Sequence, residues 1–276
     1  MASATAQLED WQLYWSPNSS AALRVVLALR VKGMALDQMH ACVPNPEPQD
    51  GNLYVVDSGD GTMVEYNTIS PEGRLPSLVV GATPGGGRRL LTQAAAILEY
   101  IEDAPELGAA GPALLPADPW ARARVRQICW LIGADTHPLQ NMGMIATAIR
   151  DYGMPKGPHG IQTHPFRVHY LRRAISALDG ILAEIAAEEG AGADGGKFSV
   201  GGALSLADIF IVPQVRNAIG AGIDVEEFPH VASVWSHCLT LAPIISTLEE
   251  CGGVVQPNPL AQKASSEGAS VASARL

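Results

Sequence analysis

The chain has 276 residues, 47% of them apolar and 17% charged, which is typical of a soluble globular protein with an ample core. Its net charge of −10 argues against nucleic-acid binding, because contacts to phosphates need clustered Lys and Arg. No apolar run is long enough for a membrane span, and the N-terminus lacks the pattern of a secretory signal. Four scattered cysteines indicate reduced thiols in an intracellular protein, neither a disulfide framework nor a zinc site.

The stretch 13–29 reads as a short strand, a polar turn and a helix. Residues 13–15 are strand formers, Pro17 breaks the run, and Ser19 or Ser20 stands where an N-cap belongs. A helix start carries partial positive charge, which attracts anions and lowers the pKa of a thiol held there. The stretch is therefore either an ordinary helix cap or a site that holds a thiolate.

The next hundred residues alternate strands and turns. Residues 35–43 read as a second strand, and the prolines within 44–51 predict a loop. The runs NLYVV and TMVEY flank a Gly/Asp turn and predict a β-hairpin. We treat residues 44–64 as an insertion.

Leu75–Pro76 stands at the entry to a further strand. Proline is poorly placed in a β-ladder, and a cis peptide bond would explain its position, since only X–Pro bonds adopt cis at low cost. A last strand follows at 88–91. Thr92 and Gln93 then open a helix that runs to about Asp103, with apolar residues at helical spacing.

The second half of the chain is helical throughout. Residues 105–119 are rich in Ala, Gly and Pro and read as an interdomain linker. Helices are predicted over 121–132 and 166–187, and Ser205 to Asp208 is a capping box that leads into another helix. Residues 254–276 are rich in Ser and Ala and are expected to be a disordered tail.

Five segments resemble one protein family in the same order. Ser19-Ser20-Ala21-Ala22-Leu23-Arg24 resembles the Ser-Ser-Cys-x-x-Arg signature of zeta-class glutathione transferases, the group that includes maleylacetoacetate and maleylpyruvate isomerases. The other four are SPEGRLPSLVV, LLTQAAAILEYIED, DTHPLQNMGMI and SLADIFIVPQVRNA. The resemblance implies an α/β thioredoxin-like domain over 1–106, an all-α substrate domain over 118–253, and a homodimer.

The resemblance also implies glutathione as the cofactor. Ser19 and Ser20 would be catalytic, with Ser19 donating a hydrogen bond to the thiolate. Leu75 would pair with the cysteinyl backbone of glutathione, and Gln93 would hold its γ-glutamyl end. The full set of glutathione residues implied is Ser19, Ser20, Ala21, Arg24, Leu75, Pro76, Gln93, Ala94, His137 and Asn141. Arg24 and Arg216 are the candidates for substrate binding.

Three positions depart from the family pattern. Ala21 replaces the motif cysteine, Ala94 replaces a serine that binds the γ-glutamyl group, and Gly220 stands where relatives place an arginine for a substrate carboxylate. Arg216 either substitutes for that arginine one turn earlier or faces solvent. Losing one hydrogen bond to a charged group costs about 1.5–3 kcal/mol, so glutathione affinity falls tenfold or more unless another group compensates.

The sequence thus predicts a glutathione-dependent cis–trans isomerase or transferase. Its substrate would be a small conjugated electrophile, either an enone or a dienoic acid. A narrower form of this prediction is an enzyme of specialised metabolism. The reaction needs no metal. The alternatives are a glutathione-independent enzyme that reuses the pocket and a non-enzymatic binding module. We expect a cytoplasmic protein; the C-terminal residues 274–276, Ala-Arg-Leu, resemble a relaxed peroxisomal address, which makes the peroxisome the alternative.

Overall fold

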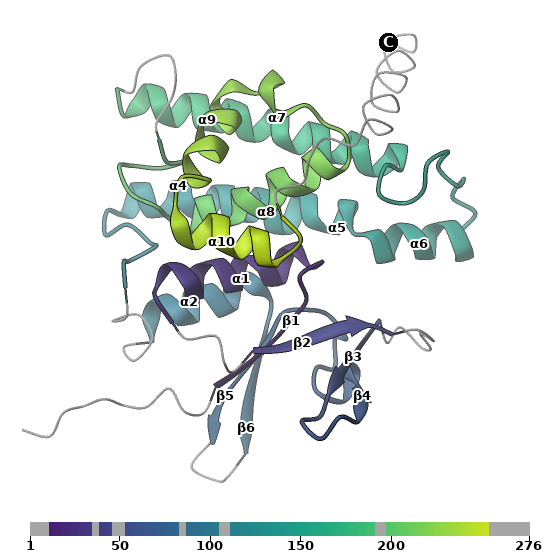
Figure 1. Ribbon diagram of the computed structural model, residues 1–276. Helices are drawn as coiled ribbons and strands as arrows, with labels where there is room; N and C mark the ends of the chain where they lie inside the picture. The colour runs from purple at the N-terminus through teal and green to yellow at the C-terminus, as the bar shows by residue number, and fades with distance from the viewer. Residues whose placement is uncertain are drawn as a thin grey trace, which may run out of the picture. The chain divides into compact units, whose positions relative to one another are not determined.

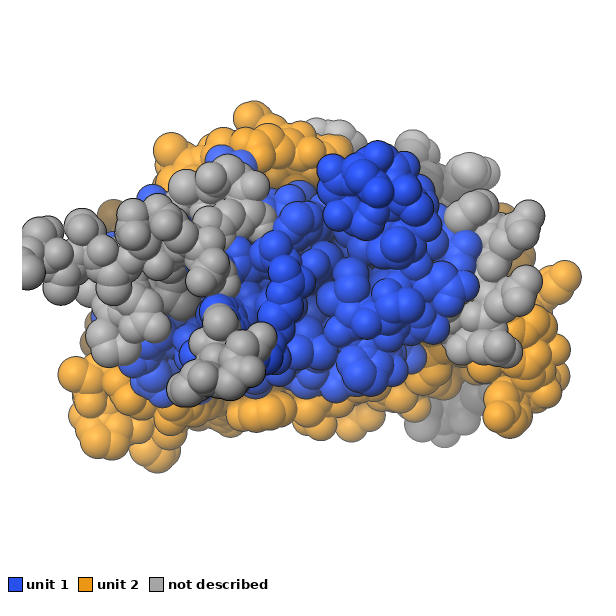
Figure 2. All heavy atoms as spheres, turned by 90° about the horizontal axis from the view of Figure 1, so that it is seen from below, with its two compact units in different colours: residues 1–114 blue, residues 115–276 orange. Residues whose placement is uncertain are grey.

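The computed structural model describes residues 11–34, 39–45, 53–82, 87–104, 111–190 and 197–253. The chain divides into two compact units, residues 1–114 and residues 115–276 (Figure 2). The boundary lies within the glycine- and proline-rich stretch 105–119.

A single six-stranded mixed sheet forms the centre of unit 1, in the order β4-β3-β2-β1-β5-β6. Strands β1 and β2 are parallel, and the other neighbouring pairs are antiparallel. The strands are β1 Trp11–Trp15, β2 Met39–Pro44, β3 Tyr54–Asp57, β4 Met63–Glu65, β5 Ser77–Ala82 and β6 Arg88–Thr92. The parallel pair joined through a helix, next to an antiparallel β5–β6 hairpin, is a thioredoxin-like arrangement.

Two helices of unit 1, α1 (Ser20–Val31) and α2 (Ala94–Asp103), pack against each other and against the sheet (Figure 1). Every residue from Ala21 to Leu29 is buried, which explains why α1 is apolar almost all round. In α2 only the stripe Ala94, Ile97, Leu98 and Ile101 is buried, at the spacing of one helical face.

A second apolar cluster has Tyr66 at its centre. Tyr66 belongs to the short 3-10 helix η1 (Tyr66–Thr68), and its side chain is fully buried among Tyr14, Cys42 and Val56. The Tyr66 hydroxyl lies 2.5 Å from the Ser77 Oγ, and burial raises the pKa of Tyr66 to about 12. This contact links η1 to the start of β5.

The predicted hairpin is confirmed. β3 pairs with β4 through Val55 and Glu65, and β3 joins the sheet through the pairing of Val56 with Cys42. The second predicted strand, over 35–43, is observed as β2 from Met39 onward, and its residues 35–38 lie outside the described part of the chain. Residues 46–52 of the expected insertion also lie outside the described part.

Unit 2 is helical in the residues described. Its helices are α4 Pro119–Trp130, the π-helical segment η2 Leu131–Thr136, α5 His137–Gln140, α6 Met142–Asp151, α7 Pro165–Glu188, α8 Leu206–Gly220, the 3-10 helix η3 Val225–Glu227, α9 Pro229–Cys238 and α10 Ala242–Glu250. Within α8, every residue except Arg216 and Asn217 is buried, so this helix is the core of the unit.

The predicted capping box of α8 is confirmed. The Ser205 side chain accepts a hydrogen bond from the helix start, and the Asp208 Oδ2 accepts one from the Ser205 N–H at 2.8 Å. Asp208 is fully buried, and its Oδ1 also accepts from the Ser199 N–H at 2.8 Å. The motif therefore fixes the preceding loop as well as the helix start.

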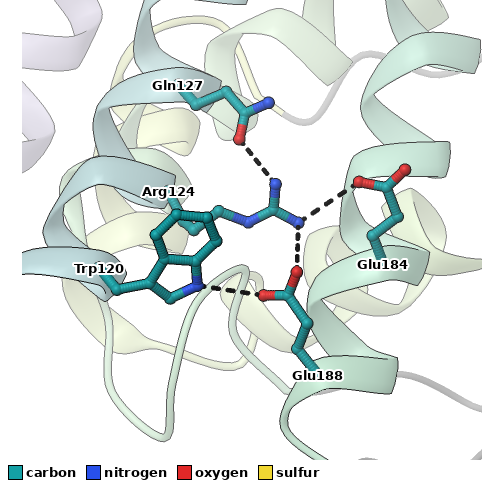
Figure 3. Close-up of polar contacts among 5 residues, drawn as sticks. All are labelled: Trp120, Arg124, Gln127, Glu184 and Glu188. Carbon is teal, nitrogen blue, oxygen red and sulfur yellow. Dashed lines mark hydrogen bonds and ion pairs between the residues drawn. The ribbon is translucent and has the colours of Figure 1, made fainter.

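Arg124 joins the first turns of α4 to the end of α7 (Figure 3). Its Nη1 donates to the Gln127 Oε1 at 2.9 Å, and its Nη2 lies 3.5 Å from carboxylate oxygens of both Glu184 and Glu188. The Trp120 Nε1 donates to the second oxygen of Glu188 at 3.3 Å. Charge and hydrogen bonding together hold the two helices.

Within the described residues, no single helix is long and apolar enough to cross a membrane. The pair α9 and α10 meets the criterion of length and composition only jointly, with a bend of 89° between the two helices.

Candidate functional site

Three of the predicted site segments lie at the same edge of the sheet. Tyr14 pairs with Ser77 across β1 and β5, and Ser77 pairs with Thr92 across β5 and β6. The turn into α1 follows β1, the Leu75–Pro76 bond precedes β5, and the start of α2 follows β6. The strand register therefore brings the starts of both helices and the Leu75–Pro76 bond to one edge.

Ser19, one of the two predicted candidates, is the N-cap of α1. Its main chain is extended, and its Oγ accepts a hydrogen bond from the Ala22 N–H at 3.3 Å. Its own N–H donates to the Ser16 carbonyl oxygen at 3.0 Å, which closes the turn between β1 and α1. Because the Oγ accepts from the backbone, the hydroxyl hydrogen is available to donate to an anion at the helix start. Ser20 is the first residue of the helix and is half-buried.

The Leu75–Pro76 peptide bond is cis, as predicted. Both side chains are buried, and Leu75 belongs to the same apolar cluster as Ala22 of α1. The β5 pairings begin at Ser77, so the main-chain groups of Leu75 lie outside the β-ladders. Main-chain groups that lie outside the ladders in this way are suited to hydrogen bonding with a peptide ligand.

Gln93 is the N-cap of α2, immediately before the helix, and has an unusual backbone conformation. Its φ is 69°, and it is the one non-glycine residue with positive φ in the described part of the chain. Its Nε2 donates to the Glu72 Oε2 at 2.9 Å, and the Thr92 hydroxyl donates to the Glu72 Oε1 at 2.8 Å. Ala94, next along the chain, is 7% exposed. A left-handed non-glycine residue is strained, and such residues concentrate at functional sites.

Glu72 is the site residue that the sequence analysis did not identify. It lies in the turn before the cis bond, 21 positions from Gln93, and its side chain is exposed. The only signal in the sequence is its place in the matched segment SPEGRLPSLVV, where a turn residue is expected.

Arg24 lies one turn into α1 and is 2% exposed. Ala21, which takes the place of the motif cysteine, is also buried. The assignments of Arg24 to glutathione or to substrate stay predictions.

His137 and Asn141 belong to unit 2. The segment 137–141, in which His137 precedes a proline, predicts an interruption of the helix. In the structure, helical backbone continues through the π segment into α5 and breaks only at Asn141, whose ψ is 120°. Asn141 then caps α6, its Oδ1 accepting from the Met144 N–H at 3.1 Å. Their roles in glutathione binding stay predictions.

A buried polar network supports this break. Gln140 and Gln214 exchange two amide hydrogen bonds, of 2.9 and 3.2 Å, and the Arg167 Nε donates to the Gln140 carbonyl oxygen at 3.1 Å. Arg167 is 2% exposed, and desolvation lowers its pKa to about 10. The network fixes the main chain immediately before Asn141.

Arg216 has a structural contact that neither sequence-based interpretation included. Its Nη2 donates to the Cys251 carbonyl oxygen at 2.7 Å, which ties α8 to the end of α10. A role for Arg216 in substrate binding stays a prediction.

Comparison with known proteins identifies the family. No protein-family model matches the chain. The chain is 31% identical over 230 residues to maleylacetoacetate isomerase of Rattus norvegicus, covering 83% of this chain and 88% of that protein. It is 31% identical over 219 residues to probable maleylacetoacetate isomerase 1 of Drosophila melanogaster, covering 79% and 72%.

A solved structure extends the match to the fold. The maleylacetoacetate isomerase of Anaeromyxobacter dehalogenans, with dicarboxyethyl glutathione and citrate bound in its active site, superposes with a TM-score of 0.62 at 29% identity, covering 86% of this chain and 90% of that one. Both units thus form the glutathione transferase fold, a thioredoxin-like domain with a helical domain. The chain belongs to the family of zeta-class glutathione transferases that includes the maleylacetoacetate isomerases.

Proposed function

We propose that this protein is a glutathione-dependent cis–trans isomerase of small conjugated acids. One observation carries the proposal: the Ser19 cap of α1, the cis Leu75–Pro76 bond and Gln93 at the start of α2 lie at one edge of the sheet, in a chain of this family. A scaffold without ligand would have no need of a strained glutamine at this edge.

Ser19 and the start of α1 stabilise negative charge on a sulfur atom. The Ser19 hydroxyl donates its hydrogen, and the unpaired N–H groups of the first helical turn add positive potential. Both effects lower the pKa of a thiol at this position, so that more of it is ionised at neutral pH. Bound glutathione supplies that thiol, which is able to add reversibly to a conjugated double bond.

The remaining residues of unit 1 orient the peptide. The Leu75 main chain offers an N–H and a C=O outside the β-ladders, which fits the peptide backbone of the cysteinyl residue. The start of α2 offers backbone N–H groups to the γ-glutamyl carboxylate. We assign Ser20, Ala21, Pro76 and Ala94 to the same surface.

The substrate class follows from the relatives. They are maleylacetoacetate isomerases, and one holds citrate with a dicarboxyethyl derivative of glutathione. This supports small carboxylic acids with a conjugated double bond as substrates. Arg24 and Arg216 are the cations of this chain that we propose for the substrate carboxylate. Arg24, His137 and Asn141 complete the proposed glutathione set.

Turnover of maleylacetoacetate or maleylpyruvate, with and without glutathione, tests the proposal. We expect isomerisation that depends on glutathione, and a decrease in kcat of about tenfold to hundredfold in Ser19→Ala, because one donor to a developing charge is lost. Ser236→Ala is the matched control, since Ser236 is an exposed residue of α9. Release of a glutathione conjugate instead of the trans acid would identify a transferase.

The same assay separates the alternatives. Equal turnover without glutathione would identify a glutathione-independent enzyme, and neither turnover nor glutathione binding would identify a binding module. We further propose a homodimer, as in the family resemblance, and sedimentation equilibrium of the full chain tests it: a monomer at micromolar concentration would contradict it.

A further inference from the structure

The Glu72 carboxylate is held in place next to the proposed γ-glutamyl site. One oxygen accepts from the Thr92 hydroxyl and the other from the Gln93 amide, at 2.8 and 2.9 Å. Thr92 ends β6 and Gln93 is the N-cap of α2, whereas Glu72 comes from the turn before Leu75. The carboxylate therefore connects the two chain segments that form this edge of the site.

Glu72 forms no ion pair within the described part of the chain. Both of its hydrogen-bond partners, Thr92 and Gln93, are neutral. A carboxylate has about four acceptor positions, and two are used here. The exposed side chain thus keeps both its charge and free acceptor capacity towards a ligand.

The Gln93 amide is oriented by the same contact. Because its Nε2 donates to Glu72, its Oε1 is the end left to accept from a ligand. Glu72 and Gln93 together therefore present the carboxylate oxygens and the Gln93 Oε1 as acceptors, beside the second N–H of the Gln93 Nε2. A group with several N–H donors and a positive charge matches them, and the γ-glutamyl end of glutathione carries such a group, its α-ammonium.

We propose that Glu72 is a specificity-determining residue that accepts the α-ammonium of the γ-glutamyl group. This inference rests on the proposed function, because it assigns one end of glutathione to this edge of unit 1. A charge-assisted hydrogen bond is stronger than a neutral one. Ala94 lacks the serine hydroxyl that binds the γ-glutamyl group in the family. The contact with Glu72 thereby offsets part of the resulting loss of glutathione affinity.

Calorimetric binding of two probes to the full chain tests the role. The first probe is glutathione, and the second is glutaryl-cysteinylglycine, which differs by lacking the α-amino group. In Glu72→Gln we expect glutathione to bind about threefold to tenfold more weakly, the size of one charge-assisted contact at an exposed site, with the affinity for the second probe unchanged. Glu65→Gln is the matched control, because it removes an exposed carboxylate from β4 of the same unit.

The outcomes are distinct. The inference is overturned if Glu72→Gln weakens the binding of both probes equally, or weakens the binding of neither; both results leave the proposed glutathione site intact. Thermal unfolding of each variant shows whether the substitution affects folding. If the wild-type chain binds neither probe at millimolar concentration, the proposed function itself is wrong, and the role of Glu72 is rejected with it.

Discussion

Lys32 and Glu102 form a buried ion pair in unit 1, with 2.7 Å between the Lys32 Nζ and the Glu102 Oε1 and side chains 0% and 7% exposed. The Nζ also donates to the Pro112 carbonyl oxygen at 3.0 Å, and the Glu102 Oε2 accepts from the Leu114 N–H at 2.9 Å. Lys32 follows α1 and Glu102 is near the end of α2. The pair therefore anchors the segment 111–114 to the ends of both helices.

Removing one partner of this pair should lower the free energy of unfolding far more than replacing both partners with apolar residues. Lys32→Met leaves the Glu102 carboxylate buried without its cation, and we expect the free energy of unfolding to fall by about 3–5 kcal/mol. Lys32→Met with Glu102→Leu should lose much less than the sum of the two single changes. Urea unfolding of the four proteins gives the coupling energy, and strict additivity would show that the pair is not formed.

Gly111 should not tolerate a side chain. Its φ is 101°, and a Cβ at this position would lie 2.6 Å from the Lys32 Cα. Gly111→Ala combines the penalty of a positive φ, about 1–2 kcal/mol, with a clash against main-chain atoms. Gly201→Ala is the matched control, because Gly201 has a φ of 69° with nothing within 4 Å of its Cβ position. We expect Gly111→Ala to unfold at clearly lower urea concentration than Gly201→Ala; equal midpoints would exclude the clash.

Features encoded by neighbouring residues were predictable from the sequence. The Ser19 cap, the capping box at Ser205 and Asp208, and the cis bond before Pro76 each depend on residues a few positions apart. The β3–β4 hairpin followed from its turn and strand formers. Local chemistry decided these elements, so local patterns identified them.

Features that depend on distant packing were not predictable. Glu72 meets Gln93, and Arg216 meets the Cys251 carbonyl, across separations of 21 and 35 positions. Strand register and helix packing set these contacts, and neither is visible in one sequence. The π segment 131–136 was not predicted: the sequence predicts a helix over 121–132 only, and nothing in that pattern indicates a change to π-helical hydrogen bonding.

The turn between β3 and β4 should loosen in acid. The Asp60 Oδ1 accepts from the Ser58 hydroxyl at 2.6 Å and from the Thr62 N–H at 2.8 Å. The Ser58 hydroxyl, followed by the Thr62 contacts, lowers the pKa of Asp60 from 3.8 to about 2. Because the pKa of Asp60 is lower in the folded turn, the ionised carboxylate stabilises the turn at pH values above 3.8. This stabilisation is lost as the pH falls from there through about 2.

Amide exchange of Thr62, measured by NMR between pH 5 and pH 2, reports on this turn. After correction for intrinsic exchange, we expect its protection to decrease at the acid end in the wild type. In Asp60→Asn protection should be lower throughout and independent of pH. A wild-type profile as flat as that of the variant would show that the Asp60 contacts do not hold the turn.

Gln93→Gly should raise stability and weaken glutathione binding. A left-handed non-glycine residue costs about 1–3 kcal/mol, of which glycine recovers part after its own entropic cost of roughly 0.5–1 kcal/mol. We therefore expect the unfolding free energy to rise by about 1 kcal/mol. The same change removes the amide that contacts Glu72, so glutathione should bind more weakly. Gln93→Asn, which tolerates positive φ and keeps a shorter amide, separates the backbone effect from the loss of the side chain. A lower unfolding free energy in Gln93→Gly would contradict the prediction, and would show that the contact of the Gln93 side chain with Glu72 stabilises the fold by more than the positive φ costs.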